Sequence, residues 1–421
     1  MRGVIINKGT VGASTENLDG CSGLLLNGVA IVATESVAGV VIGTAYKLTK
    51  LQDALDRGID AAYDTANNVR VYRHISEFYR MAGDGTVLYL MVCAQTKTPA
   101  QMIADHSHAL VAFADGDIRF LAVGYNPASG YSALPIDGME TVVREAIAPA
   151  QALHDWTWDT DRPLNVILEG RGMNGLAASM LNLRGIEVSG NVVDYGNVSV
   201  CIGQDWTYAD GLTGFAQNFA DIGTLLGSRA YLPCNRNIGE VGTMNIANTK
   251  KSIWLVAGLS NHSKIADMES SLETLDEKGY IFGISYTGIT GYRWNNDHVC
   301  APEVVDADGF MNESTMAYGA TLGKAARKLR VKLLPKVKTT VPVDTSTGLL
   351  PTGMVKYFEG LGDAALAEMI AAGEISGGKT TVDATSNLLS GTKELKMGFV
   401  IVPTGTINEI TGSINLKTTL S

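Results

Sequence analysis

Two glycine-rich stretches have the residue types of phosphate-binding loops. The first, Gly170–Gly175, reads G-x-G-x-x-G between an apolar run and an expected helix, the context of a dinucleotide fold. Asp194 lies near the position of a ribose-binding acid. Against this, Glu169 precedes the loop, where its charge would repel a pyrophosphate, and the expected helix is short. A tight strand-to-helix turn is favoured, and a soluble α/β enzyme that binds a dinucleotide at Gly170–Gly175 is the alternative.

The second stretch, Gly373–Thr380, matches the string G-x-x-x-x-G-K-[ST]. That motif holds phosphate when a strand precedes the loop and a helix follows it. Here an expected helix comes first, and the residues after the loop are β-prone. Gly373 is therefore interpreted as the glycine that ends a helix, and we expect no phosphate site.

The other reactive side chains do not combine into a site in the sequence. His106 and His108 are two residues apart, which would put them on different faces of a helix. His298 and Cys300 could offer two metal ligands, but no second pair lies nearby. The five cysteines are widely spaced without a C-x-x-C, which is typical of buried thiols in a reducing compartment. We expect no catalytic residue, no metal and no cofactor.

The composition is that of an acidic protein with a large core. The length of 421 residues predicts two or three domains, and the hydrophobic fraction of 46% is enough for a large core. The net charge of −10 argues against nucleic acid as the main partner, because phosphate binding needs an excess of basic side chains. Met1–Lys8 lacks the apolar region of a signal peptide, and Glu35 interrupts the apolar stretch Gly20–Tyr46. We expect neither secretion nor membrane insertion.

Apolar runs alternate with helical segments over most of the chain. The expected strands are Thr86–Cys93, Ile118–Val123, Leu164–Leu168, Asn197–Ile202, Ser252–Ala257 and Tyr280–Ser285. The expected helices are Leu51–Ala62, Ala100–Ala114, Glu140–His154, Gly175–Leu183, Gly214–Leu226 and Ala266–Lys278. Continuous apolar strands between helices predict an α/β fold whose sheet is covered on both faces.

The pattern changes after Met311. A long amphipathic helix is expected over Asn312–Leu334, and seven basic residues with no acid lie between Lys324 and Lys338. A second helix, Met354–Ala372, precedes two β-like stretches, Leu395–Val402 and Glu409–Thr418. Four basic residues of the first helix lie away from its apolar stripe, namely Lys324, Arg327, Lys328 and Lys332.

Both ends of the chain have the character of arms. The β-prone apolar residues there are Val4, Ile5 and Ile6 at the start and Ile410, Ile414 and Leu416 at the end. They have no obvious strand partner in their own chain, although both arms could also fold back on their own domain. The expected division is an N-terminal arm (1–20), an α/β body (21–318) with possibly two subdomains, a compact α+β C-terminal domain (319–404) and a C-terminal arm (405–421).

This order, together with particular strings, resembles the contractile tail sheath proteins of phages and related injection systems, especially those of Mu-like and Bacteroidetes-type tails. The strings that carry the resemblance are Gly58–Tyr63, His74–Tyr79, Gly83–Met91, Gly291–Asp297, Lys324–Pro335, Phe358-Glu359 and Met369–Ile375. The resemblance implies a multi-domain sheath fold with a mixed α/β body, a compact α+β C-terminal domain and β-prone terminal arms.

The resemblance also implies a function without catalysis. A sheath subunit polymerises helically around a tail tube and contracts to drive the tube through a target envelope. The implied partners are other copies of the chain, the tail tube protein, and baseplate and terminator proteins, in a virion tail assembled in the host cytoplasm.

The resemblance assigns roles to the arms and to the basic helix. In sheaths the arms add strands to the sheets of neighbouring subunits, which satisfies their backbone groups. The C-terminal domain lies innermost with its helix facing the tube, so Lys324, Arg327, Lys328 and Lys332 would meet an acidic tube surface. An ordinary solvated helix face is the alternative for these four residues.

Overall fold

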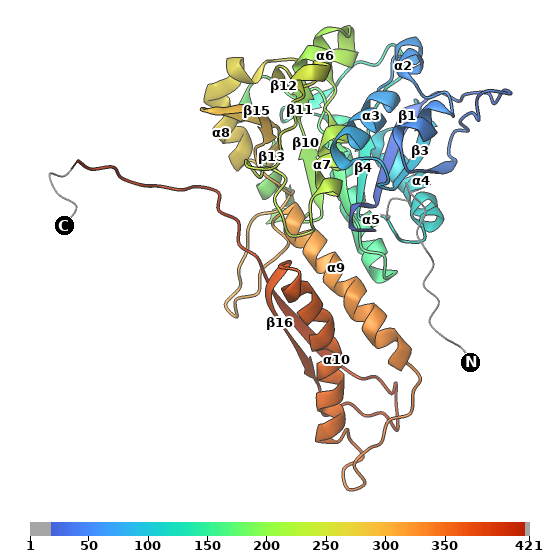
Figure 1. Ribbon diagram of the computed structural model, residues 1–421, viewed down its shortest axis with the longest axis vertical. Coiled ribbons are helices and arrows are strands. Elements are labelled where there is room, and N and C mark those ends of the chain that lie inside the picture. Colours follow the sequence, from blue (N-terminus) through green and yellow to red (C-terminus); the bar gives the residue numbers. More distant parts are fainter. Residues whose placement is uncertain (1–17, 417–421) are drawn as a thin grey trace. The chain divides into compact units, whose positions relative to one another are not determined.

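The computed structural model describes residues 18–416. The chain divides into two compact units, Met1–Arg327 and Lys328–Ser421, called here the body and the C-terminal unit. The helix α9 (Met316–Leu333) crosses the division (Figure 1). The expected boundary between residues 318 and 319 lies inside this helix.

The body is built on a seven-stranded sheet with the order β13-β10-β7-β4-β1-β3-β2. All neighbouring strands are parallel except β2, which pairs antiparallel with β3 at one edge. The strands are β1 (Ser22–Gly28), β2 (Ala45–Leu48), β3 (Leu88–Ala94), β4 (Phe120–Gly124), β7 (Asn165–Glu169), β10 (Val198–Cys201) and β13 (Tyr280–Ile281). Strands β3 and β2 lie on one side of β1, whereas β4 and the later strands of the sheet lie on its other side. The strand order therefore reverses between β1 and β4.

Helices cover the sheet, and its central strands are buried on both faces. Consecutive side chains of a strand point to opposite faces, and Leu24, Leu25 and Leu26 in β1 are all fully buried. Helix α3 packs along α7, and α4 packs along α5 (Figure 1). The prediction of an α/β fold with a sheet covered on both faces is therefore confirmed.

The remaining elements are short or lie outside the main sheet. The helices are α1 (Leu51–Leu55), α2 (Ala61–Asn67), α3 (Val71–Ala82), α4 (Pro99–Phe113), α5 (Thr141–Asp159), α6 (Trp206–Asp210), α7 (Ile222–Tyr231), α8 (Glu269–Glu277), α9 and α10 (Thr352–Ala371). The two-stranded pairs are β5 (Pro135–Ile136) with β6 (Met139–Glu140), β8 (Glu187–Val188) with β9 (Asn191–Val192), β11 (Gly203–Asp205) with β12 (Ala257–Leu259), β14 (Gly283–Tyr286) with β15 (Ile289–Trp294), and β16 (Ile375–Val382) with β17 (Met397–Pro403).

Several sequence-based expectations for the body are wrong. The helix expected over Gly175–Leu183 is replaced by two single 3₁₀ turns, Ala177–Ser179 and Leu183–Gly185. The strand expected over Ser252–Ala257 does not form, because Ser252 and Trp254 have positive φ angles and an extended strand cannot pass through them.

Helix boundaries also differ from the expected ones. The segment Leu51–Ala62 contains α1 and only the first two residues of α2, since Gly58 takes a left-handed φ of 83° between the two helices. Gly214–Leu226 is divided into a 3₁₀ turn over Gly214–Asn218 and the start of α7. The sequence analysis did not predict helix α3, which is strongly amphipathic. It lies between the expected helix Leu51–Ala62 and the expected strand Thr86–Cys93.

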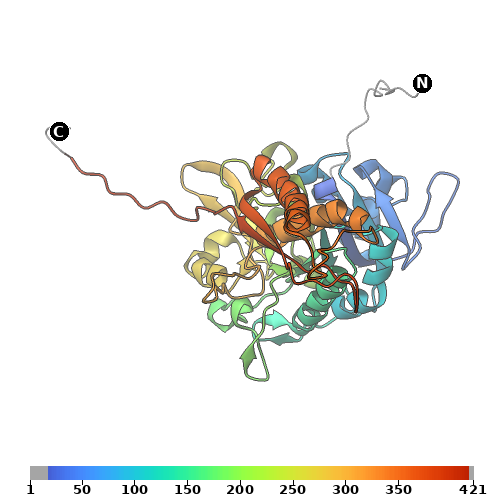
Figure 2. The same cartoon turned by 90° about the horizontal axis from the view of Figure 1, so that it is seen from below.

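The C-terminal unit consists of α10 against the β16–β17 hairpin, together with the end of α9 (Figures 1 and 2). Its small core contains Phe358, Leu366 and Met369 from α10 and Ile375 from β16. A Cβ at Gly362 would collide with Thr380 of β16, so glycine permits the close approach of helix and hairpin. Residues 404–416 form neither helix nor strand, and the strand expected over Glu409–Thr418 is absent from the described part of this segment.

Candidate assembly surfaces

The crevice where an open α/β sheet usually binds a ligand is filled by the chain's own side chains. Such ligands lie outside the carboxyl ends of the strands, where the strand order reverses. Asn27 at the end of β1 donates to the carbonyls of Ala94 (2.8 Å) and Lys97 (2.9 Å). The amide of Asn126, just after β4, donates to the carbonyl of Asn27 at 2.9 Å. These two asparagines occupy the crevice at the carboxyl ends of the paired strands β1 and β4.

The glycine loop Gly170–Gly175 is filled as well. The carboxylate of Glu169 accepts hydrogen bonds from the backbone amides of Tyr125 (2.6 Å) and Ala220 (3.1 Å). The buried guanidinium of Arg171 donates to the carbonyls of Tyr125 (2.7 Å) and Phe215 (2.6 Å). Burial raises the pKa of Glu169 to about 7, although Arg171 and the two amides favour its charged form.

The position of Gly172 also argues against a dinucleotide. Its φ is +59°, and a Cβ there would collide with the carboxylate of Glu140. The loop therefore packs on Glu140, and the segment after it forms a 3₁₀ turn rather than an α-helix whose first amides could hold a phosphate. The structure does not support the alternative of a dinucleotide-binding enzyme.

The second glycine string has the order that the sequence indicated. Gly373 follows α10 with a φ of +71°, and residues 375–382 form strand β16. The amides of a strand pair with its neighbour and cannot cradle a phosphate as a helix start does. Gly373–Thr380 is therefore a helix end followed by a hairpin strand.

A buried ionic cluster joins α3 to the segments around α7. Arg73 contacts Asp221 at 2.6 Å and Asp205 at 3.1 Å, with Glu77 further away at 3.9 Å. Burial disfavours its charge, but these three carboxylates outweigh burial and raise the pKa of Arg73. Burial also raises the pKa of Asp205, which the charge of Arg73 opposes. The cluster is buried within the body, where Nε of Arg73 and one oxygen of Asp221 form no hydrogen bond with residues 18–416.

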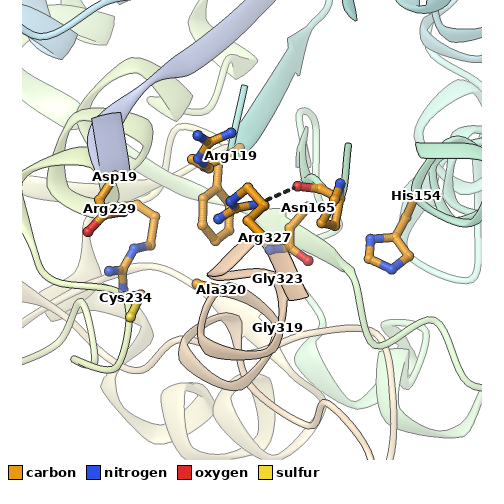
Figure 3. A pocket seen from close by; sticks show the side chains of 12 residues that line it. Asp19, Arg119, His154, Asn165, Arg229, Cys234, Gly319, Ala320, Gly323 and Arg327 are labelled. Atoms are coloured by element: carbon orange, nitrogen blue, oxygen red, sulfur yellow. Dashed lines mark hydrogen bonds between the residues drawn. The ribbon is translucent and has the colours of Figure 1, made fainter. Parts of the chain in front are cut away.

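Two of the four predicted tube-facing residues are engaged within the body. Lys324 forms an ion pair with Asp19. Arg327 donates to the carbonyl of Pro163 at 3.0 Å and lies beside Arg119 at the wall of a small cavity (Figure 3). Burial, together with the charge of Arg119, lowers the pKa of Arg327 to about 9.

The other two predicted residues share one carboxylate in the C-terminal unit. Lys328 contacts one oxygen of Glu368 at 2.8 Å, and Lys332 contacts the other at 2.9 Å. The hydrogen bonds and charges of the two lysines lower the pKa of Glu368 to about 2. All four residues thus have an interaction within their own chain, and their tube-facing role stays a prediction.

The structure describes the apolar residues of the predicted C-terminal arm but not those of the N-terminal arm. Val4, Ile5 and Ile6 lie outside the described residues. In the C-terminal arm, Ile410, Ile414 and Leu416 are 87%, 97% and 100% exposed. These apolar side chains have no cover in residues 18–416, which is unusual for a folded monomer unless another molecule covers them.

The β16–β17 hairpin is a surface that sequence reasoning missed. Within residues 18–416 it forms a sheet of only two strands, so the outer edge of each strand has no strand partner. Phe399, Val400 and Val402 of β17 are exposed. An isolated two-stranded sheet is marginally stable, and open edges accept further strands. The β-prone runs were visible in the sequence, but the long connection between them hid their pairing.

Residues 18–416 contain neither a metal-binding group nor a helix that could span a membrane. No group of three or more His, Cys, Asp or Glu side chains in this range could hold a metal ion. Nor does any helix in the described part of the chain have the length and apolar character needed to cross a membrane.

Comparisons with known proteins place the chain in a family. The model of DUF2586, N-terminal domain, matches residues 11–298, and that of DUF2586, C-terminal domain, matches residues 320–421. No curated protein matches the sequence.

Solved structures match along nearly the whole chain. A chain of the anti-feeding prophage baseplate is 12% identical with a TM-score of 0.54, and the alignment covers 99% of both chains. A sheath tail protein from Desulfitobacterium hafniense is 11% identical with a TM-score of 0.50, over 96% of this chain and all of the other. The sheath fold that the resemblance implied is confirmed. The chain belongs to the DUF2586 family and has the fold of contractile tail sheath proteins.

Proposed function

We propose that this chain is the sheath subunit of a contractile tail or related injection system. Copies of it polymerise helically around a tail tube and shorten on triggering to drive the tube through a target envelope. The observation that carries the proposal is the likeness to a sheath tail protein over 96% of this chain and all of the other. The tube protein, the baseplate and a terminator are the further partners, and the virion tail is the location.

The exposed arm supports polymerisation. A segment with four nearly bare apolar side chains, Ile407, Ile410, Ile414 and Leu416, gains free energy by leaving water. As a strand it also needs a partner for its backbone groups. The open edges of the β16–β17 hairpin in a neighbouring copy supply both, and the N-terminal Val4–Ile6 would use the other edge. Main-chain hydrogen bonds of this kind tie subunits together without a large preformed interface.

The body supports the mechanical part of the proposal. Its charges are paired internally around Arg73 and Arg171, and its crevice is closed by Asn27 and Asn126. Such a unit can move as a rigid body while the arms keep neighbouring copies joined. Contraction then needs no catalytic residue and no cofactor, because the free energy comes from a lattice with more buried contact.

Electron microscopy of the purified full chain at high concentration tests polymerisation. We expect hollow, striated tubes of uniform width. Deletion of 405–421 should leave a folded protein with unchanged circular dichroism, since the described part of this segment forms no helix or strand, and should abolish the tubes. Tubes that persist after deletion of both 1–10 and 405–421 would show that the arms do not join the subunits.

A matched pair of point variants separates arm pairing from a general effect of charge. Ile414→Asp places a carboxylate where an apolar side chain should become buried, and we expect it to prevent assembly. Asn415→Asp adds the same charge at the neighbouring position, whose side chain points to the other face of an extended strand. We expect Asn415→Asp to assemble. Equal loss in both variants would contradict strand addition by this segment.

A further inference from the structure

The C-terminal unit contains an open groove with an apolar floor and a basic rim. Its volume is about 600 Å³. The apolar lining includes Leu333, Phe358, Leu388, Met397 and Phe399. The rim has four lysines and one acid, Lys336, Lys338, Lys393, Lys396 and Glu394. A groove of this size accommodates several side chains of a bound segment.

The rim lysines differ from those of helix α9. Lys328 and Lys332 pair with Glu368, whereas no carboxylate of residues 18–416 forms an ion pair with any of the four rim lysines. The ammonium of Lys336 lies 5.5 Å from the centre of the Tyr357 ring. The charge of Lys396 helps to lower the pKa of Asp383. The rim therefore has a surplus of positive charge that the described residues do not neutralise.

We propose that this groove binds an acidic amphipathic segment of another tail component, with its apolar side chains on the floor and its carboxylates against the rim lysines. The inference rests on the proposed function for the origin of the partner. It replaces the face of α9 as the main basic contact of the C-terminal unit. Apolar burial supplies affinity, and the lysines select the partner by its charge.

The charge of this chain's own arms argues against a second copy as the occupant. Residues 1–17 contain Arg2, Lys8 and Glu16, and residues 405–421 contain only Glu409 and Lys417. Neither arm has the negative charge that four lysines require. Nucleic acid is a poorer fit as well, because the whole chain has a net charge of −10, which repels a polyanion.

A binding measurement with defined probes tests this groove. Fluorescence anisotropy would compare two labelled 18-residue amphipathic helical peptides, both with leucines on one face, and with either glutamates or lysines on the other. We expect the full chain to bind the acidic peptide at least tenfold more tightly than the basic one. Higher salt should weaken binding of the acidic peptide.

Two matched double variants locate the binding. Lys393→Glu/Lys396→Glu should lose at least tenfold in affinity for the acidic peptide. Lys250→Glu/Lys251→Glu changes two exposed lysines of the body by the same charge and should leave the affinity unchanged. Phe399→Ser should weaken binding while preserving its salt dependence, because it removes apolar floor and no charge.

The possible outcomes distinguish this inference from the proposed function. Equal binding of the two peptides, equal losses in the two double variants, or tighter binding of a single-stranded DNA oligonucleotide would overturn the inference. If Lys393→Glu/Lys396→Glu abolished the hollow polymers that the chain forms by itself, the occupant of the groove would be a second copy. That result would overturn the inference too. Failure of the unmodified chain to form tubes, with peptide binding intact, would count against the sheath assignment only.

Discussion

The body and the C-terminal unit differ in whether their charged side chains have partners within the described part of the chain. In the body, Arg73 is surrounded by carboxylates and Arg171 by carbonyls, and both are buried. In the C-terminal unit, the lysines at the rim of the groove are left without ion pairs by residues 18–416. A buried charge must be matched inside its own chain because desolvation costs several kcal/mol, whereas a surface charge costs little until a partner arrives. This difference agrees with our proposals that the body moves as a rigid unit and that the C-terminal unit binds other tail components.

The largest effect is expected where the buried cluster is broken. Asp221→Ala leaves the guanidinium of Arg73 without its nearest carboxylate, at a site where both side chains are buried. Breaking a buried pair in this way costs about 3–5 kcal/mol. Denaturant unfolding of the soluble chain, monitored by circular dichroism, should show a loss of this size.

A control variant keeps that test specific. Asp159→Ala removes an exposed aspartate at the end of α5 and should change the free energy of unfolding by less than about 0.5 kcal/mol. Equal losses in the two variants would remove the distinction between the body's paired charges and its surface charges.

The second prediction concerns pH and the buried Glu169. Its pKa is about 7 in the folded chain, against an ordinary 4.5, because burial disfavours the carboxylate. Between pH 4.5 and 7 the folded state holds a proton that the unfolded state has released. The free energy of unfolding therefore falls as the pH rises through this range. The full span corresponds to roughly 3 kcal/mol.

The variant Glu169→Gln isolates this contribution from other buried groups. Asp64 and Asp297, whose pKa values burial raises to about 7 and about 6, act in the same direction in both proteins. Burial lowers the pKa of His74 to about 3, which acts in the opposite direction, again in both proteins. The stability of the unmodified chain relative to Glu169→Gln should rise as the pH is lowered from 7 to 4.5. A difference that is constant with pH would mean that Glu169 is ionised throughout.

The third prediction compares glycines in the two units. Gly223 at the start of α7 lies against the backbone of His74 in α3, and a Cβ there would collide with it. Overpacking of this kind costs about 1–3 kcal/mol. Gly360 in α10 has nothing within 4 Å of its Cβ position. Alanine there should stabilise the helix by up to about 1 kcal/mol.

Thermal unfolding of the two alanine variants checks this comparison. Gly223→Ala should unfold at a lower temperature than the unmodified chain, and Gly360→Ala at the same or a higher one. A loss with Gly360→Ala would point to a contact on α10 made by another copy, because no atom of residues 18–416 occupies that space.

The sequence predicted the parts of the fold that depend on local pattern. The apolar run at Thr86–Cys93 became β3, and the amphipathic segment at Asn312–Leu334 became α9, because burial in each follows a simple periodicity. Patterns were insufficient where tertiary contacts decide. Trp254 lies in an apolar run but takes a positive φ, with its indole nitrogen against Thr224 at 3.3 Å.

The candidate sites show the same division. The sequence predicted a C-terminal arm from Ile410, Ile414 and Leu416, whose side chains are exposed in the described part of the chain, and it rejected the phosphate loops on local grounds. It could not show that Lys324 would pair with Asp19, 305 residues away in the chain, or that Lys336 and Lys393 would border one groove. Such pairings depend on the complete fold, and no spacing in the sequence encodes them.

The smallest effect is expected on the exposed face of α9. Glu368→Gln removes the carboxylate that Lys328 and Lys332 share, but all three side chains are in contact with water. Solvent screens such pairs, so unfolding in physiological salt should change little or not at all. The same variant releases two lysines to the surface. If α9 is the tube-facing element, Glu368→Gln should strengthen attachment of the sheath to its tube in a co-sedimentation assay. If the groove is the acidic partner's site, attachment should stay as it was while Lys393→Glu/Lys396→Glu reduces it, so the two basic surfaces of one small unit can be told apart.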